Sequence, residues 1–280
     1  MNTIVLTDLK NRKISLAGSF NELTRQQLIR LSDIIHRQFH PDTKRLMILK
    51  TLLVSGFNPF RTWLFHFRLS PGAAMDMFPV TEFALKSPDL TRQLIPSIRI
   101  PYSFKKLYGP SDDCKNLVFI EFIMAERNYA KFRKTGEVQF LDNLIAILYR
   151  RKKENYNPTS VNYDGDIRER YNDDLVEGRA KKISKLDINI KLAILTYYHG
   201  CRDHIIGQKK FSLVFTKEKK DKIEGSSGKH TWEDVLMELA EHKTGYLDSV
   251  SFTSLYTILF IINSQIAINR QKIKDLKKRK

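Results

Sequence analysis

Residues 115–150 read KNLVFIEFIMAERNYAKFRKTGEVQFLDNLIAILYR, and they contain the clearest periodic pattern of the chain. Apolar side chains recur there at three- and four-residue steps on both sides of Thr135-Gly136, which is the spacing of amphipathic α-helices. A glycine directly after such a segment is a common helix C-cap. Because the link between the two segments is short, the pattern predicts two antiparallel helices that form a helical hairpin.

Downstream of this hairpin, polar segments alternate with further helical patterns. A long polar loop is predicted over 151–178, followed by one helix over 179–206. The charged stretch 216–229, which also contains glycine and serine, predicts a linker. After it, Thr231 is expected to cap a helix that Gly245 ends, and a last helix is expected to run into the C-terminal tail.

Upstream of the hairpin, the signals are more varied. Weak alternation over 3–18 predicts a β-hairpin, and Ser19 to Glu22 has the spacing of a capping box. A buried helix is predicted over 43–54, with Asp42 as its N-cap. Six of the nine prolines lie in 57–110, so short helices, loops and a strand or two are expected there.

Aromatic side chains gather at the start of that proline-rich region. A base-stacking platform would need such a group, but a packed core under a loop-rich region is the favoured interpretation, because aromatic residues dominate core burial. The residues concerned are Phe57, Phe60, Trp63, Phe65 and Phe67.

Taken together, these patterns predict a mainly α fold. We expect a helical bundle-like domain with a short N-terminal β-hairpin and a loop region rich in proline and aromatic residues. The expected divisions are a β-hairpin (1–20), a helical and loop-rich N-terminal part (21–110), a central helical domain (111–215) with the polar loop 151–178, a flexible linker (216–230), a C-terminal helical pair (231–270) and a basic tail (271–280).

The net charge of +17 is concentrated at the two ends of the chain. Residues 1–50 carry +5 and residues 251–280 carry +6, whereas the 150 residues of 51–200 carry only +6. A basic block of this kind is usually a solvated tail, and in some proteins it is an arm that binds nucleic acid or another acidic surface. The candidate binding residues are Lys272, Lys274, Lys277, Lys278, Arg279 and Lys280.

Cysteine content and hydropathy predict the cellular compartment. Two cysteines are too few for a disulfide framework, which indicates a reducing compartment. No signal peptide is recognisable, and the longest apolar run, near Leu255–Ile262, is far shorter than the roughly 20 residues that cross a bilayer. We therefore expect no membrane partner and a location in the cytoplasm.

Signals for catalysis or for a cofactor are weak. One short segment contains residue types that can bind a metal, namely His199, Cys201, Asp203 and His204. A zinc site needs four ligands with definite spacing, and the sequence has no second pair of ligands to complete such a site with this segment. The stretch 225–231 departs from the Walker spacing and follows a charged segment instead of a buried strand. A helix break is the simplest interpretation of His40-Pro41-Asp42, which resembles J-domain cochaperones only in those three residues and the flanking helices. No catalytic residue, metal or cofactor is therefore predicted.

The polar loop contains several carboxylates that could recruit a divalent cation. Interspersed arginines favour a loop that neutralises its own charge, and neither an EF-hand nor a two-metal nuclease spacing is present. A metal-dependent hydrolase or nuclease stays open as one alternative function. The carboxylates are Asp164, Asp166, Glu169, Asp173 and Asp174, and the arginines are Arg168, Arg170 and Arg179.

Three parts of the chain carry a resemblance to known proteins. They are LYGPSDDCKNLVFIEFIMAERNYAKFRKTG (107–136), then FLDNLIAILYR (140–150) with GDIRERYND (165–173) and RAKKISKLDINIKLAILTYYHGCR (179–202), and TWEDVLMELAEHKTGYLDSVSFTSLYTILFIIN (231–263). Together they resemble an uncharacterised family of helical proteins of bacterial phage and prophage genes. The last segment is similar to the ends of small helical proteins used in tail assembly. The resemblance covers roughly residues 100–265 and carries no catalytic motif.

The resemblance implies a non-enzymatic structural or assembly component of a tailed, phage-like particle that acts through protein–protein contacts. Its expected partners are other virion or assembly proteins, or a second copy of the chain. It would act in the bacterial cytoplasm during assembly, with the mature virion as a further location. The alternative from a different class is an accessory protein that binds non-specific nucleic acid through its basic termini.

Overall fold

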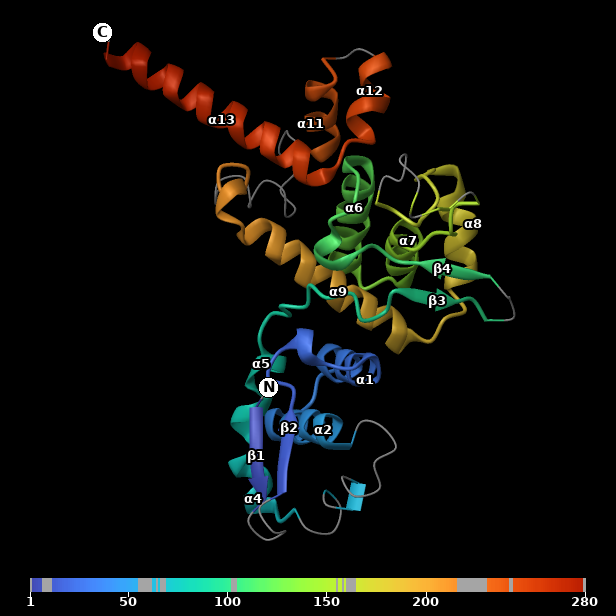
Figure 1. The fold of residues 1–280 in the computed structure, drawn as a ribbon, viewed down its shortest axis with the longest axis vertical. Coiled ribbons are helices and arrows are strands. Elements are labelled where there is room, and N and C mark those ends of the chain that lie inside the picture. Colours follow the sequence, from blue (N-terminus) through green and yellow to red (C-terminus); the bar gives the residue numbers. More distant parts are fainter. Residues whose placement is uncertain are drawn as a thin grey trace. The chain divides into compact units, whose positions relative to one another are not determined.

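The computed structural model describes residues 2–6, 12–54, 62–63, 65, 69–101, 105–154, 156–157, 159, 165–215, 231–241 and 244–278. It is mainly α-helical, as the sequence predicts, with short antiparallel strand pairs (Figure 1). The chain forms two compact units, and neither is a single continuous stretch. Unit 1 contains residues 1–95 and 186–201, and unit 2 contains residues 96–185 and 202–280.

Unit 1 combines an N-terminal hairpin with short helices. The predicted hairpin is present, with Ile4 opposite Ile14 in an antiparallel register. The elements are β1 (Asn2–Leu6), β2 (Arg12–Leu16), the 3₁₀ turn η2 (Phe20–Glu22), α1 (Arg25–His36), α2 (Pro41–Val54), α4 (Pro71–Asp76), η4 (Phe78–Thr81), α5 (Glu82–Leu85) and the first two-thirds of α9 (Ile188–Gly207).

Within unit 1, helix α9 packs against the backbone near Leu90. A Cβ atom on Gly200 would lie 2.3 Å from the carbonyl oxygen of Leu90, so a glycine is needed at this contact. The next residue, Cys201, is 1% exposed, and its sulfur lies 3.9 Å from that same oxygen. A segment more than a hundred residues further along the chain therefore completes the core of the first 95 residues.

Two expectations about helix starts in unit 1 are wrong. Ser19 makes no side-chain cap, and Glu22 instead accepts a hydrogen bond from the backbone N–H of Gly18. The capping box lies five residues later, where Thr24 and Gln27 satisfy each other's backbone N–H groups at the start of α1. Asp42 is not an N-cap, because α2 already begins at Pro41.

These caps give a direct test of the corrected start of α1. Replacing Thr24 with Ala is expected to lower the free energy of unfolding by about 1 kcal/mol, because the N–H of Gln27 loses its acceptor. Replacing Ser19 with Ala is expected to change it by less than about 0.5 kcal/mol. Urea denaturation of both variants measures the difference, and equal losses would contradict the assignment.

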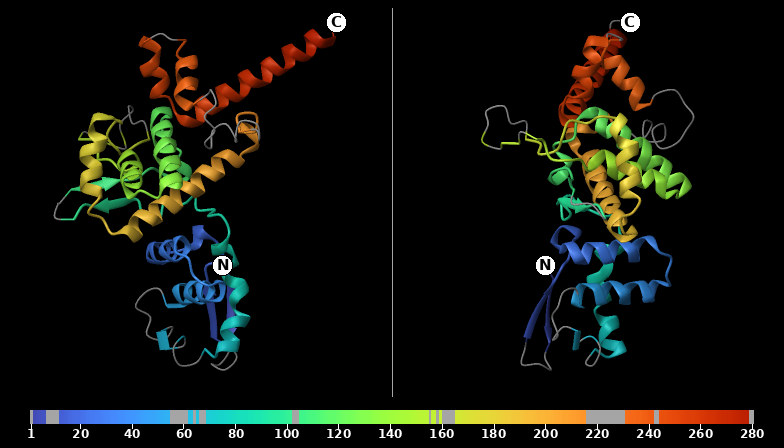
Figure 2. Two further views of the ribbon diagram at one scale, coloured as in Figure 1. Left: turned by 180° about the vertical axis from the view of Figure 1, so that it is seen from behind. Right: turned by 90° about the vertical axis from the view of Figure 1, so that its right-hand side faces the viewer.

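Unit 2 is built on the predicted helical hairpin, with α6 and α7 packed side by side (Figures 1 and 2). Gly136 ends α6 in the left-handed conformation, as the Thr135-Gly136 signal predicts. The elements are β3 (Ser97–Arg99), β4 (Lys106–Tyr108), η5 (Asp112–Cys114), α6 (Phe119–Thr135), α7 (Val138–Leu148), α8 (Asp174–Ile183), the end of α9, η6 (Lys209–Phe211), α11 (Trp232–Leu239), α12 (Thr244–Ser251) and α13 (Leu255–Lys278).

The second half of the chain differs from the prediction at three helix boundaries, and the first is the start of α8 at Asp174, inside the loop predicted over 151–178. The single helix expected over 179–206 is two helices, because the chain turns at 184–187 between α8 and α9. Gly245 does not end the helix after Thr231, since α11 ends at Leu239 and Gly245 lies inside the additional helix α12. Thr231 does cap α11, in a capping box with Asp234.

Helix α13 is attached to unit 2 by its first turns. The N–H of Leu255, the first residue of α13, donates to the carbonyl of Leu117 at 2.9 Å, next to a bridge between Val118 and Ser254. The hydroxyl of Tyr256 donates to the carbonyl of Asp113 at 3.0 Å. The last turns of α13 extend past α6 and α11 (Figures 1 and 2), and every residue from 267 to 278 is exposed.

The linker 216–230, the loop segment 225–230 and the aromatic residues Phe57, Phe60 and Phe67 lie outside the described residues. Of that aromatic group, Trp63 is 39% exposed and Phe65 is half-buried. In the described part of the chain, no helix is both long enough and apolar enough to cross a membrane.

Candidate functional site

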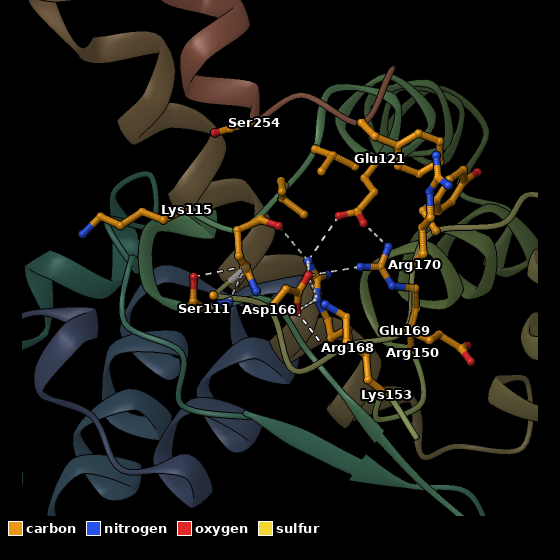
Figure 3. Close-up of a pocket in the computed structure, with 16 residues that line it drawn as sticks. Ser111, Lys115, Glu121, Arg150, Lys153, Asp166, Arg168, Glu169, Arg170 and Ser254 are labelled. Atoms are coloured by element: carbon orange, nitrogen blue, oxygen red, sulfur yellow. Dashed lines mark hydrogen bonds and ion pairs between the residues drawn. The ribbon is translucent and has the colours of Figure 1, made fainter. Parts of the chain in front are cut away.

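Four charged side chains meet inside unit 2, next to a cavity that several of them line (Figure 3). Glu121 comes from the first turn of α6, and Arg150 follows the end of α7. Asp166 and Arg168 come from the polar loop. These four residues are referred to below as the ion network.

Backbone pairing holds the two arginines in position. The N–H and C=O groups of Arg150 pair with those of Tyr108 at 3.0 and 2.7 Å, so the chain after α7 lies beside β4. Arg168 occupies an isolated bridge with Lys152, which fixes the far side of the polar loop. The loop residues near this bridge are thereby joined to the end of the helical hairpin.

Each carboxylate of the ion network contacts both arginines. Glu121 accepts hydrogen bonds from Nη1 of Arg150 and, at 3.2 Å, from Nη2 of Arg168. Asp166 accepts from Nη2 of Arg168 at 2.8 Å and from Nη2 of Arg150 at 3.4 Å. Figure 3 shows both carboxylates turned toward the two guanidinium groups. Two negative and two positive charges therefore balance.

Three of the four side chains of the ion network are almost completely removed from water, and the fourth, Asp166, is 14% exposed. Arg168 is 0% exposed, Arg150 and Glu121 are each 1% exposed, and Arg168 also donates to the backbone carbonyls of Leu148 and Asn116. Burial lowers the pKa of Arg150, and Glu121 opposes that shift. Burial acts in the same direction on Arg168, but Glu121 and Asp166 outweigh it and keep its pKa above the ordinary arginine value.

The cavity beside the ion network has a volume of about 560 Å³. Its mouth carries further cations, and these are engaged as well. Lys115 pairs with Asp113 at 2.7 Å, while Arg170 pairs with Asp248 at 2.8 Å and lies 3.6 Å above the ring of Phe252. Most of the charged groups that the structure describes around this cavity thus pair with one another, although Nε of Arg150 is buried without a hydrogen-bond partner.

The acidic loop behaves as its interspersed arginines predict. Asp166 pairs with Arg168 within the ion network, and Glu169 pairs with Arg179 at 2.9 Å. Asp173 accepts a hydrogen bond from the hydroxyl of Tyr171 at 2.7 Å. Asp164 lies outside the described residues. Among the residues that the structure describes, no group of three His, Cys, Asp or Glu side chains is placed to hold a metal ion.

The other motifs singled out in the sequence have structural positions. Cys201 is the last residue of unit 1 and is buried in α9. Arg202 belongs to unit 2 and pairs there with Glu126 at 2.8 Å. Pro41 and Asp42 form the first turn of α2. Lys272, Lys274, Lys277 and Lys278 lie on the exposed last turns of α13, whereas Arg279 and Lys280 lie outside the described residues.

Sequence reasoning did not identify Glu121 or Arg150 as members of one cluster. The available signal was a carboxylate between Phe119 and Phe122, on a helix whose neighbouring residues are apolar. A charge in such a position needs a partner once it is buried, but the partners lie 29 to 47 residues away.

No known family, curated protein or solved structure matches the chain.

Proposed function

We propose that the protein is a non-enzymatic structural or assembly component of a tailed, phage-like particle and that it acts through protein–protein contacts. The observation that carries this proposal is the exposed apolar surface of the C-terminal helices. Seven of the fourteen large apolar side chains that are exposed among the described residues lie within 231–278. They are Met237, Tyr246, Phe260, Ile261, Ile273 and Leu276, together with Ile268, which lies on another side of α13 and is not part of the proposed contact surface.

Exposed apolar side chains that gather on one part of a protein are typical of a surface that binds another protein. The same segment supplies the part of the resemblance that is similar to tail-assembly proteins, namely 231–263. The ion network supports this proposal from another direction. It joins the polar loop to the helical hairpin, so the part of unit 2 to which the C-terminal helices are attached is held together by several contacts.

Genetics gives the test of this role. The neighbouring genes are expected to encode a tail-tube protein and a long coiled-coil, tape-like protein. When the gene is disrupted in the phage or prophage that carries it, the particles induced from that phage or prophage are expected to lack complete tails in electron micrographs. A plasmid copy of the intact gene should restore them. Normal tails in the disrupted strain would contradict the proposal.

The exposed lysines at the end of α13 favour one second candidate, a nucleic-acid-binding accessory protein. If this candidate is correct, the protein should bind generic duplex DNA tightly at moderate salt and lose that binding when 271–280 is deleted. Its affinity should fall steeply as salt is added, because binding to phosphates releases counterions. Weak, deletion-insensitive binding would leave the assembly role as the better proposal.

A further inference from the structure

Helix α13 carries one apolar stripe that starts inside unit 2 and continues beyond it. Leu255 and Leu259 are 0% exposed and Ile262 is 8% exposed, so this part of the stripe is packed within the unit. Helices α13 and α6 contact each other directly, and the side chain of Asn263 accepts a hydrogen bond from the N–H of Leu213. The first half of the stripe is therefore an ordinary intramolecular helix contact.

The same spacing continues into the exposed half of the helix. From Leu255 onward the stripe advances by alternating steps of four and three residues, and after Ile262 it reaches Ile266, Asn269, Ile273 and Leu276. Ile273 is 53% exposed and Leu276 is 63% exposed. A strict repeat of 3.5 residues is the pattern of a coiled-coil seam, in which each apolar side chain fits between side chains of a facing helix.

The positions that flank the exposed seam are basic. Arg270, Lys272 and Lys277 occupy places beside the seam residues, where a facing helix in a coiled coil places its own charged side chains. Two copies of this helix would bring like charges together whether they paired in parallel or in antiparallel. Self-association through the seam is therefore disfavoured, and a facing helix with glutamate or aspartate at the matching places is favoured.

We infer that the seam formed by Ile266, Asn269, Ile273 and Leu276 binds an amphipathic helix of a partner protein whose flanking positions are acidic. The inference rests on the proposed function, because it gives the assembly surface a partner of defined chemistry. Asn269 sets the register, since a polar side chain inside a seam needs a polar group opposite it. The buried first half of α13 holds the exposed half in a helical conformation and so reduces the ordering cost of binding.

The shape of the seam distinguishes a helical partner from a lipid surface. A helix that lies in a membrane interface presents a wide apolar face, whereas this seam is narrow and contains an asparagine. Ile268 is as exposed as Ile273, at 55%, yet it lies well off the seam around the helix. These two isoleucines therefore supply a matched pair of positions for the test.

The test uses the full chain and two synthetic three-heptad peptides. Both peptides have isoleucine and leucine in the seam with one asparagine, and they differ only in having glutamate or lysine at the flanking positions. By fluorescence anisotropy, the glutamate peptide is expected to bind at least about tenfold more tightly than the lysine peptide. Equal binding of the two peptides, or no binding of the glutamate peptide, would overturn the inference.

Matched variants locate the binding surface. Ile273→Asn is expected to weaken binding of the glutamate peptide by about tenfold or more, because the bound peptide would bury Ile273 and asparagine cannot replace that apolar contact. Ile268→Asn is expected to change it by less than about twofold, since that residue faces away from the partner. Both variants should keep the thermal unfolding temperature of the parent. Equal losses in the two variants would reject the seam as the binding surface.

Two further probes separate the other classes of partner. The full chain is also tested with anionic phosphatidylserine vesicles and with duplex DNA. If either of these binds more tightly than the glutamate peptide does, the inference is overturned in favour of that partner. The assembly role is measured separately, by the tails of particles from the disrupted strain. Missing tails together with no peptide binding would reject the acidic helix and leave the proposed function standing.

Discussion

Replacing Glu121 with Gln is expected to lower the free energy of unfolding by about 3–5 kcal/mol, because it leaves two buried guanidinium groups facing one carboxylate. Glu121 is 1% exposed and accepts hydrogen bonds from both Arg150 and Arg168, so neither arginine has water as a replacement partner. A buried pair adds little stability compared with well-packed apolar residues, yet removing one partner is costly. Urea denaturation followed by circular dichroism measures the loss.

The control for this experiment is an exposed ion pair on a helix of the same unit. Glu177 pairs with Lys181 at 2.7 Å, and the two side chains are 80% and 74% exposed. Replacing Glu177 with Gln is expected to leave the urea midpoint of unfolding almost unchanged, since such surface pairs contribute little. If Glu121→Gln cost no more than this control, the ion network would not hold unit 2 together.

Replacing Gly200 with Ala is expected to destabilise unit 1 by about 1–3 kcal/mol, because the new methyl group would overlap the backbone of Leu90. A Cβ atom there would lie 2.3 Å from the carbonyl oxygen and 2.6 Å from the nitrogen of Leu90. Backbone atoms cannot turn aside as a flexible side chain can, so either α9 or the segment around Leu90 must shift. Hydrogen exchange and thermal unfolding would report the loss.

A second helical glycine supplies the opposite expectation. Gly178 lies inside α8, and a Cβ atom there would meet nothing within 4 Å. Replacing Gly178 with Ala is expected to stabilise the protein by about 0.5–1 kcal/mol, because alanine loses less conformational freedom in a helix. A stabilising effect at both glycines would show that the contact between α9 and Leu90 is looser than the structure indicates.

The sequence predicts best where local and tertiary preferences agree. The α6–α7 hairpin is such a case, because strong periodicity, a short link and Gly136 all favour the same structure. The helix start at Ser19 is the opposite case. Thr24 with Gln27 also has the spacing of a capping box, and only the packed structure decides which of the two hydroxyls begins the helix.

The break between α8 and α9 was not predictable from periodicity. Apolar residues continue through 183–194 without a proline or glycine, so the pattern is that of one helix. The ion network was hidden for a different reason. Its acidic loop was recognisable as self-neutralising, but Glu121 and Arg150 are brought to it by tertiary packing of α6 and α7. A single sequence does not reveal such pairs.

The divided composition of unit 1 affects how the chain folds while it is being synthesised. The first 95 residues leave the ribosome long before 186–201 exists, and that later segment supplies the contact with Leu90. At typical bacterial and eukaryotic elongation rates the delay is about 5–20 s. During this interval the N-terminal segment has an incomplete core, and a nascent chain with exposed apolar surface is a natural client for ribosome-associated chaperones.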